Sequence, residues 1–362
     1  MSEAADTAVF RFSAVGWHEL EGWDHCAFDD FPVAFGTTRH LLPEYWQDFS
    51  TALDSIRAGG VSIRRLIEEH LQPWHVLPET QSAIALTGYF EPEFDGSLKP
   101  TPEFQVPLFR TPDDLIVPDP SLRASAGDEP LTVRQNANGS RSTYPTRAEI
   151  EGGALSGRGL ELMYLRDDLD AFVLHVQGSG VIRLRSGNRQ RVTFAAKNGH
   201  PYRSVGQELI RRGVLSADGM TLDAMIAWLR AQTDAVRQSL LWHNPSFIFF
   251  DLIDSDHAIG AAGTPLHPLR SMAVDPKTHP LGTPIFVVAP DMPTVDGAGM
   301  RGFNRLMISH DAGSAIRGPV RGDVFFGTGA EAGLKAGAVR HAATFYALRP
   351  KAWRPSDAEN QH

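Results

Sequence analysis

Three aspartates, Asp275, Asp311 and Asp323, lie within the span 271–323. Each stands beside an apolar run that is typical of a strand, and each has Gly or Pro close by. Placing a carboxylate next to the apolar core of a sheet costs free energy, so the clustering needs a reason. One interpretation is that each aspartate caps a turn, where its side chain accepts a hydrogen bond from the backbone two residues on. The other is that the carboxylates carry acid–base chemistry.

Hydrogen-bonding and aromatic residues suited to a sugar ligand occur in further stretches. The segment TGYFEP (87–92) follows an apolar run, and Pro92 prevents that strand from continuing inside a sheet. The pieces HVQGSG and AAKNGHPY add polar side chains in the middle of the chain. Sugar hydroxyls need donors and acceptors, and sugar ring faces need apolar walls. The candidate substrate-binding residues are Thr87, Tyr89, Glu91, Gln177, Ser179, Lys197 and Asp275.

Several of these residues also fit a purely structural interpretation. Tyr89 could equally be a core aromatic residue, and Lys197 with Asn198 could simply form a hairpin turn. For Asp275 a structural role is favoured over a ligand role. His175 alternates with apolar neighbours in FVLHVQG, which favours a core histidine over a catalytic one.

Other kinds of site find no support in the sequence. No GxSxG, Walker or GxGxxG motif stands in a suitable context, and Gly178-Ser179-Gly180 is too short for a nucleophile elbow. The 14 His residues show no HExxH spacing and no CxxC motif occurs, so neither a metal site nor a cofactor is predicted. The single Cys26 excludes an internal disulfide and is interpreted as a buried structural thiol.

Composition narrows the classes of partner and compartment. With 42% hydrophobic and 21% charged residues, the composition is that of an ordinary soluble globular protein. The net charge of −9 argues against nucleic acid as a partner. No apolar run approaches the length of a membrane span, and MSEAADTAVF lacks the features of a secretion signal. We therefore expect either a cytosolic protein or one whose processed segment is missing from this sequence.

The periodicity of apolar residues predicts a β-rich chain with a few helices. Pro and Gly are abundant, which favours many turns, and no internal repeat occurs. Helices are predicted at 43–60, 61–72, 144–155, 205–213, 220–242 and 329–341. Strands are predicted from 82, at 160–167, at 171–187 with an interruption at Gly178 and Gly180, at 189–202 with Asn198-Gly199 as a hairpin turn, at 246–253 and at 341–350.

This pattern predicts two domains, one interrupted by the other. Residues 1–106 and 244–349 would form a discontinuous β-domain, residues 107–243 an inserted β-domain, and residues 350–362 a charged, frayed tail.

The motifs together resemble one known family. The span 271–349 is similar to the domain named for three aspartates that is found in the membrane-bound lytic transglycosylase A family. The matching pieces are AVDPKTHPLGT, ISHDAGSAIRG, RGDVFFGTG and EAGLKAG. The similarity extends back through NPSFIFF, AAKNGHPYRSVG, HVQGSG and TGYFEP, and so covers roughly 82–349.

The resemblance implies a fold, a site and a reaction. The fold would be mainly β, with a double-psi β-barrel made from the two outer segments, an inserted barrel-like β-domain and peripheral helices. A deep groove between the domains would hold the glycan strand of peptidoglycan. The family cleaves the β-1,4 bond between N-acetylmuramic acid and N-acetylglucosamine without water, leaving a 1,6-anhydro-muramoyl end. Its single catalytic acid matches Asp323, while Asp311 and Asp275 match the other two family aspartates, Asp311 in a supporting role.

Two other functions remain open at this point. One is a hydrolytic glycosidase on the same barrel, and the other is a non-catalytic protein that binds cell-wall glycan. The family is usually a lipoprotein, but Cys26 has no apolar stretch before it that would mark a lipid anchor. We therefore expect a periplasmic protein, associated with the outer membrane if a signal or anchor is missing here. We also expect a monomer. Cell-wall synthesis or division proteins are the partners that the resemblance implies besides peptidoglycan.

Overall fold

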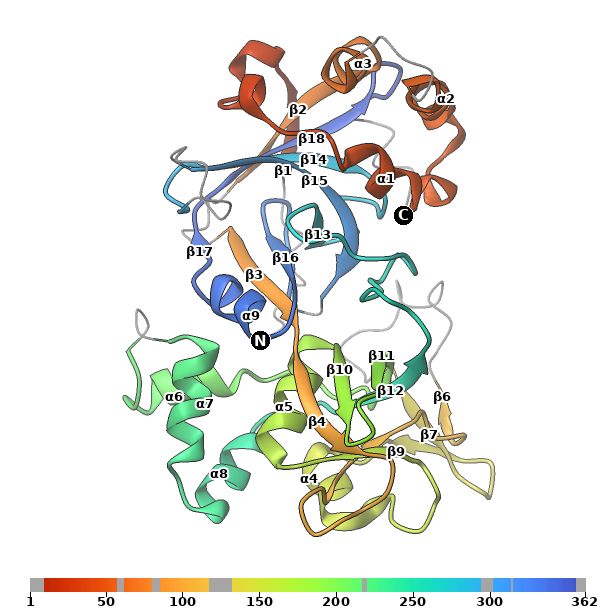
Figure 1. The fold of residues 1–362 in the computed structure, drawn as a ribbon, viewed down its shortest axis with the longest axis vertical. Coiled ribbons are helices and arrows are strands. Elements are labelled where there is room, and N and C mark those ends of the chain that lie inside the picture. Colours follow the sequence, from red (N-terminus) through yellow and green to blue (C-terminus); the bar gives the residue numbers. More distant parts are fainter. Residues whose placement is uncertain are drawn as a thin grey trace. The chain divides into compact units, whose positions relative to one another are not determined.

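The computed structural model describes residues 10–56, 62–79, 85–116, 132–216, 220–293, 302–313 and 315–355. The chain divides into two compact units, whose elements are labelled in Figure 1. The first unit comprises Met1–Phe90, Ile259–Gly327 and Glu331–His362, and the second comprises Glu91–Ala258 and Thr328–Ala330. The first unit is therefore assembled from both ends of the sequence.

One nine-stranded sheet dominates the first unit. Its strands, in spatial order, are β1 (Phe10–Ala14), β2 (Leu71–Pro78), β18 (Thr344–Pro350), β14 (Pro284–Ala289), β15 (Phe303–Ala312), β13 (Ser271–Val274), β16 (Gly322–Thr328), β3 (Leu86–Glu91) and β17 (Arg340–His341). In Figure 1 the orange β3 lies beside the blue β16, although the two are far apart in sequence. The predicted mainly β class is confirmed. The order is linear, so the pairings of the described residues do not close the barrel that the resemblance implied.

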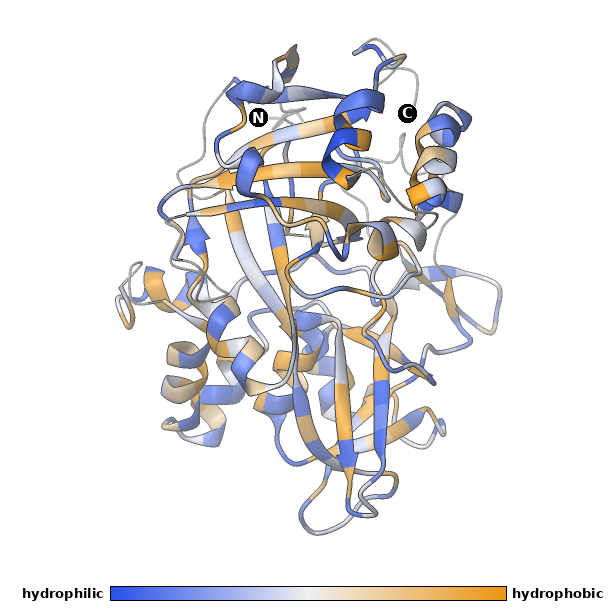
Figure 2. Ribbon diagram, turned by 45° about the horizontal axis from the view of Figure 1, so that its top comes forward, coloured by the Kyte–Doolittle hydropathy of each residue, from blue (hydrophilic) through white to orange (hydrophobic). Residues whose placement is uncertain are grey.

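Apolar side chains cover both faces of this sheet. All six residues of β14 are buried, and the strands in Figure 2 carry long hydrophobic stretches. One cluster joins β13, β14 and β16 through residues such as Met272, Val287 and Val324. A second cluster is rich in aromatic rings from the N-terminal segment, and it also contains Cys26, which is buried as predicted.

Short helices complete the first unit. They are α1 (Phe31–Gly36), α2 (Gln47–Ser55), α3 (Ile63–His70) and α9 (Ala330–Gly337), with 3₁₀ turns at Trp17–Glu19, Trp23–His25, Arg39–Leu41 and Glu44–Trp46. The helices predicted at 43–60, 61–72 and 329–341 are confirmed, but the second ends at His70, where β2 begins, and the third ends at Gly337, before β17. Residues 57–61 lie outside the described residues. The predicted tail is packed at its start, because Trp353 is only 4% exposed and its ring lies 5.2 Å from that of Trp74. Residues 356–362 lie outside the described residues.

The second unit contains a six-stranded sheet and a small three-stranded one. The larger has the order β12 (Ile248–Ile253), β11 (Arg189–Lys197), β10 (Ser179–Leu184), β4 (Glu93–Ser97), β9 (Glu161–Leu165) and β5 (Val106–Phe109). Its end strands β12 and β5 also contact each other. The smaller consists of β6 (Leu115–Ile116), β7 (Val133–Gln135) and β8 (Arg141–Thr143).

This unit includes more of the chain than the insert of 107–243 that the sequence predicted. Strand β4 pairs in parallel with β10, and β12 pairs antiparallel with β11. Both flanking segments therefore contribute strands to its sheet. The unit begins at Glu91 and its main segment ends at Ala258.

The helices of the second unit correct two predictions. They are α4 (Arg147–Glu149), which continues as a π-turn at Ile150–Ala154, α5 (Asp168–Gln177), α6 (Val205–Arg211), α7 (Leu222–Arg230) and α8 (Asp234–Leu241). The strand predicted from 171 is wrong up to Gln177, because Asp167 caps a helix there by accepting a hydrogen bond from Asp170 N (2.9 Å). Gly178 ends that helix at φ 79°. The single helix predicted at 220–242 is two helices, α7 and α8.

The hairpin predicted at Asn198-Gly199 is also wrong, because helix α6 follows instead of a strand. The buried Asn198 amide donates to Pro145 O and Pro245 O, both at 2.9 Å, and accepts from Phe247 N at 2.9 Å. Asn198 therefore holds three separate segments together. Gly199 has φ 83°, where a Cβ would lie 2.8 Å from Thr132.

His175 is a core histidine, as the sequence favoured, although it lies on α5 and not on a strand. Its side chain is buried against Phe247, and Arg147 Nη2 lies 2.9 Å from its Nδ1. Burial and the Arg147 charge hold the His175 pKa well below its ordinary value. The neutral ring therefore accepts the guanidinium hydrogen bond at Nδ1.

Candidate active site

Two of the three predicted aspartates flank a single alanine of strand β13. In the antiparallel pair of β13 and β16, Ala273 lies opposite Asp323. In the parallel pair of β13 and β15, an irregularity after Met272 brings Ala273 opposite Asp311. Residues opposite each other on paired strands project to the same face of a sheet. The register therefore places both aspartates on one face, with only the methyl group of Ala273 between their strands.

Strand β3 supplies a hydrogen-bond partner to each aspartate. Thr87 Oγ1 donates to Asp323 Oδ1 at 2.7 Å, and Tyr89 OH donates to Asp311 Oδ2 at 2.8 Å. The two donors are two residues apart on one strand, so their side chains share a face. The structure thus brings together four residues that the sequence singled out.

Gly88, between these donors, explains how β3 is held in place. A Cβ at Gly88 would lie 2.7 Å from Ala336 O and 2.8 Å from the Phe326 ring. Helix α9 therefore packs directly on the backbone of β3, on the face opposite Thr87 and Tyr89. This close approach requires glycine, because a side chain would push β3 away from the helix.

Asp311 is held by the backbone as well as by Tyr89. Its Oδ1 accepts hydrogen bonds from Ala261 N at 2.8 Å and from Ala312 N at 2.9 Å. The Tyr89 ring packs against Phe325 with centroids 5.2 Å apart. Asp311 therefore has a fixed orientation, which is what a residue that tunes a neighbouring carboxyl requires.

Arg321 is a charged neighbour of Asp323 that the sequence reading missed. Its Nη2 donates to Thr87 Oγ1 at 2.9 Å, and its Nη1 donates to Gly322 O at 2.6 Å. The signal in the sequence was the cation two residues before the aspartate in RGDVF. Arg321 lies just before β16, and this closeness in sequence could have marked it as a charged neighbour of Asp323.

The electrostatics of this cluster shift Asp323 toward its protonated form. Burial raises its pKa to about 6, and the Asp311 charge adds to the rise, while the Thr87 hydrogen bond and the Arg321 charge oppose it. Burial also raises the pKa of Asp311, against the opposing effect of its three hydrogen bonds. Burial and Asp311 hold the Tyr89 pKa well above its ordinary value, so its hydroxyl stays a donor. A carboxyl with a pKa near the working pH can both give and take a proton.

Asp275 has a different environment. Its Oδ1 accepts from Lys277 N at 3.2 Å, and its Oδ2 accepts from Gly318 N at 2.9 Å. Its backbone oxygen accepts from His279 N at 3.0 Å. Among the described residues no hydrogen bond joins it to Asp311 or Asp323. These contacts are those of a turn, the role that the sequence favoured for this residue.

Glu91 forms a buried ion pair in the second unit. Its side chain is 0% exposed, and Arg191 donates to both carboxylate oxygens, from Nε at 2.7 Å and from Nη2 at 3.0 Å. Thr328 Oγ1 donates to Oε2 at 2.7 Å, and Gly329 N donates to the backbone oxygen of Glu91 at 2.8 Å. Both carboxylate oxygens thus already accept hydrogen bonds from the protein, which favours a structural role for Glu91 over the predicted substrate contact.

The three other candidates lie at element ends of the second unit. Gln177 is the last residue of α5, Ser179 is the first of β10, and Lys197 is the last of β11. All three are half-buried. Ser179 lies opposite Thr193 in the pair of β10 and β11, so its position is set by the sheet.

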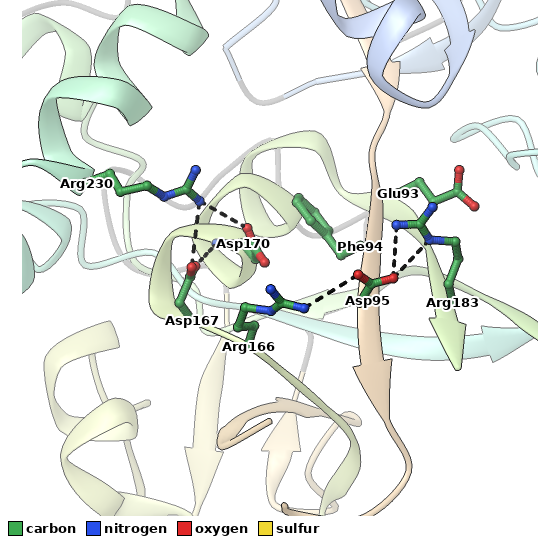
Figure 3. A pocket seen from close by; sticks show the side chains of 8 residues that line it. All are labelled: Glu93, Phe94, Asp95, Arg166, Asp167, Asp170, Arg183 and Arg230. Atoms are coloured by element: carbon green, nitrogen blue, oxygen red, sulfur yellow. Dashed lines mark hydrogen bonds and ion pairs between the residues drawn. The ribbon is translucent and has the colours of Figure 1, made fainter. Parts of the chain in front are cut away.

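A cavity of about 370 Å³ in the second unit contains none of the candidate residues. It is lined by Glu93, Phe94, Asp95, Arg166, Asp167, Asp170, Arg183 and Arg230. Figure 3 shows Arg183 and Arg166 directed toward Asp95, and Arg230 directed toward Asp167 and Asp170. Its charged groups therefore pair largely with one another.

Neither a metal-binding cluster nor a membrane-spanning helix occurs among the described residues. In this part of the chain no three His, Cys, Asp or Glu residues gather where they could hold a metal ion. None of the helices at the described positions is long and apolar enough to cross a membrane.

Comparison with protein families gives two matches that together cover most of the chain. The family described as MltA specific insert domain matches residues 85–251. The family described as 3D domain matches residues 270–349. Asp311, Asp323 and Arg321 lie within the second match, and Thr87, Tyr89 and Glu91 within the first.

Two relatives carry the name membrane-bound lytic murein transglycosylase A. The protein from Vibrio cholerae is 34% identical over 265 residues, which span 73% of this chain and 64% of the relative. The protein from Escherichia coli K12 is 30% identical over 331 residues, which span 88% of this chain and 81% of the relative.

Solved structures of similar proteins agree in fold. A membrane-bound lytic murein transglycosylase from Agrobacterium tumefaciens matches with a TM-score of 0.82 and 32% identity, over 97% of this chain and 100% of that one. Escherichia coli MltA with bound chitohexaose matches with a TM-score of 0.71 and 28% identity, over 94% of each chain.

Proposed function

Because the chain belongs to the membrane-bound lytic murein transglycosylase A family, we propose that it cleaves the glycan strands of peptidoglycan with Asp323 as its acid and base. The bond broken is the β-1,4 link between N-acetylmuramic acid and N-acetylglucosamine, and the product is a 1,6-anhydro-muramoyl end. The observation that carries the proposal is the half-buried Asp323 carboxyl, with a pKa of about 6, beside Asp311 and Thr87.

The first step requires a protonated Asp323. The carboxyl donates its proton to the glycosidic oxygen as the bond from that oxygen to C1 of the muramoyl sugar breaks. At a pKa of about 6, a useful fraction of the carboxyl is protonated near neutral pH, whereas an ordinary Asp, with a pKa of about 3.9, would be almost fully ionised. Burial beside Asp311 therefore supplies what the acid step needs.

The second step uses the same carboxylate as a base. It removes the proton of the muramoyl 6-hydroxyl as that oxygen bonds to C1 of its own ring. The nucleophile is tethered to the reacting carbon, which supplies the large effective concentration of an intramolecular reaction. The proton returns to Asp323 and no water is consumed. One carboxyl thus suffices, in contrast to the two that glycoside hydrolases use.

The glycan is bound by other residues in this proposal. The chitohexaose in the Escherichia coli structure is a chain of β-1,4-linked amino sugars, which supports a glycan ligand for this chain. Gln177, Ser179 and Lys197 remain the proposed contacts in the second unit, and Tyr89 and Thr87 act through the two aspartates. The glycan groove, the monomeric state and partners among cell-wall synthesis or division proteins stay predictions.

Peptidoglycan lies outside the cytoplasmic membrane, so we propose that the enzyme works in the periplasm. The two relatives are named membrane-bound, which supports attachment to a membrane surface. Fractionation of cells expressing the natural gene would test this placement.

The acid–base role predicts that Asp323→Ala and Asp323→Asn lose activity and keep the fold. Proton transfer by a positioned side chain accounts for about 10²- to 10⁴-fold in rate, so we expect a loss of at least that size. Release of soluble fragments from purified peptidoglycan measures the rate. Asp291→Asn, at an exposed carboxylate of the same unit, is the matched control and should retain wild-type activity.

Mass analysis of the fragments tests the reaction itself. Anhydro products are lighter by one water than the products of hydrolysis. Hydrolysis products from the wild type would replace this proposal with a glycosidase, and binding without any release would replace it with a glycan-binding protein. An Asp323→Ala variant that retains the wild-type rate would exclude Asp323 as the acid.

A further inference from the structure

Two consecutive hydrogen bonds connect Arg321 to Asp323 through Thr87. Arg321 Nη2 lies 2.9 Å from Thr87 Oγ1, and Thr87 Oγ1 lies 2.7 Å from Asp323 Oδ1. The guanidinium is itself anchored, because Nη1 donates to Gly322 O at 2.6 Å. Thr87 is thus the middle member of a chain that ends on one of the two carboxyl oxygens.

The direction of each hydrogen bond follows from the chemistry of the groups. A guanidinium has only donors, so Thr87 Oγ1 must accept from Arg321. A hydroxyl has one hydrogen, and its acceptor here is Asp323 Oδ1. Arg321 therefore keeps the Thr87 hydroxyl in the role of a donor to Oδ1.

The two oxygens of Asp323 are consequently unequal. In a neutral carboxyl the carbonyl oxygen is the better acceptor, so the oxygen that faces the Thr87 hydrogen is the carbonyl and the acid hydrogen lies on the other. Among the described residues no partner meets Oδ2 within hydrogen-bond distance. Oδ2 is thus the oxygen that carries the proton, and no hydrogen bond from the described residues competes for it.

We propose that Arg321 is a positioning residue, which acts through Thr87 to station the catalytic proton of Asp323 on Oδ2. This inference rests on the proposed function and adds to it the atom that reacts. The Oδ2 proton passes to the glycosidic oxygen as the bond to C1 breaks. The proton of the 6-hydroxyl then passes to Oδ2 as the bond from O6 to C1 forms. Oδ1 stays hydrogen-bonded throughout, so the carboxyl need not rotate between the two steps.

Arg321 also affects the pKa of Asp323, which can be measured. Its positive charge and the Thr87 hydrogen bond both lower the pKa of Asp323, against burial and Asp311. Removing either should raise that pKa. The acid step needs the protonated form, so the fall in kcat/KM at high pH should then move to higher pH.

The experiment compares Arg321→Gln, Arg321→Lys, Thr87→Val and Thr87→Ser in the full chain. An opposite charge within about 4–6 Å shifts a carboxyl pKa by about one unit or more, so Arg321→Gln should move the high-pH limb of kcat/KM up by about one pH unit. Thr87→Val should move it in the same direction and lower kcat, because the proton is then shared between both oxygens. Thr87→Ser retains the hydroxyl and should restore most of the wild-type profile.

Two further measurements separate positioning from substrate contact and from misfolding. The Asp323 pKa is read directly in the free enzyme from the ¹³C carboxyl shift, and it should rise in Arg321→Gln and Thr87→Val. The KM should change little in either. Arg317→Gln, at an arginine whose side chain is 63% exposed and 3.9 Å from Asp275, is the matched control and should leave the profile unchanged.

Each outcome of these measurements either supports or overturns the role of Arg321. If Arg321→Gln and Thr87→Val fold and keep the wild-type carboxyl shift and pH profile, the inference is overturned. If they raise KM alone, both residues are substrate contacts and the inference is also overturned. Arg321→Lys is the second variant to measure if Arg321→Gln fails to fold. It keeps the positive charge and should therefore retain most of the wild-type pH profile. Failure of the proposed function itself would appear separately, as a wild type that forms no anhydro product.

Discussion

At the scale of single residues, the Asp323 carboxyl is acted on by two charges of opposite sign. Arg321 lowers its pKa and Asp311 raises it, while burial provides the largest upward contribution. The result is an acid whose pKa of about 6 is set by neighbours on two other strands and in the preceding turn. Changing one neighbour should therefore move the pH profile in a direction that its charge decides.

Asp311→Asn should move the high-pH limb of kcat/KM to lower pH, opposite to Arg321→Gln. The amide removes the like charge that raises the pKa of Asp323, so a smaller fraction of the acid is protonated at neutral pH. We expect a shift of about one pH unit. The amide oxygen can still accept from Ala261 N and Ala312 N, so the fold should persist. A profile that stays in place would show that Asp311 does not act on Asp323 through its charge.

The sequence predicted the members of this cluster but not which of them are hydrogen-bonded to each other. Asp323, Asp311, Thr87 and Tyr89 were all candidates from residue type and resemblance. That Thr87 binds one aspartate and Tyr89 the other depends on the register of β3, β13, β15 and β16, which local patterns do not contain. The contact between Arg321 and Thr87 was missed for the same reason, since the two residues lie on distant parts of the chain.

At the scale of elements, most strands and helices followed from apolar periodicity, and the errors have local causes. Residues 171–177 contain branched and aromatic residues that favour a strand, yet Asp167 and Gly178 provide the two ends of helix α5. Asn198-Gly199 has the residues of a hairpin turn, but the buried amide of Asn198 binds two other segments, at Pro145 and at Pro245–Phe247. In both places tertiary contacts and capping outweighed the local preference.

Strand β3 ends at Glu91, whose ion pair with Arg191 should contribute strongly to the stability of the second unit. Glu91→Ala leaves Arg191, only 11% exposed, without its anionic partner, and such a loss costs about 3–5 kcal/mol of unfolding free energy. Urea denaturation measures the change. Arg189→Ala removes the pair with Glu93 at a side chain that is 58% exposed, and it should cost less than about 1 kcal/mol. A Glu91→Ala variant with normal stability but a raised KM would instead support the substrate contact that the sequence predicted.

At the scale of the whole molecule, the first unit needs both ends of the chain, whereas the second is nearly continuous. In the nine-stranded sheet, β2 lies beside β18, and β3 lies between β16 and β17. The sequence predicted a discontinuous domain from the return of strand patterns after 244. It did not predict that β4 and β12 join the sheet of the second unit, because pairing across long separations leaves no local signal.

The topology predicts that the fragment 91–258 folds alone and that the fragment 259–362 does not. The first retains its six-stranded sheet and its own apolar clusters, whereas the second lacks β1, β2 and β3. Near-ultraviolet circular dichroism and amide NMR spectra of each fragment measure the difference. A cooperative unfolding transition in the fragment 259–362 would contradict this division of the fold.

The hydrogen bonds from Thr87 and Tyr89 to their aspartates span 236 and 222 residues of sequence. During synthesis the two donors emerge long before the carboxyls that they bind, and contacts of such separation form late in folding. A growing chain, or one that ends before β16, therefore lacks the Asp323 carboxyl that Thr87 binds. The proposed glycan cleavage therefore needs strands from both parts of the sequence, and the order of synthesis by itself keeps the site incomplete until β16 has been made.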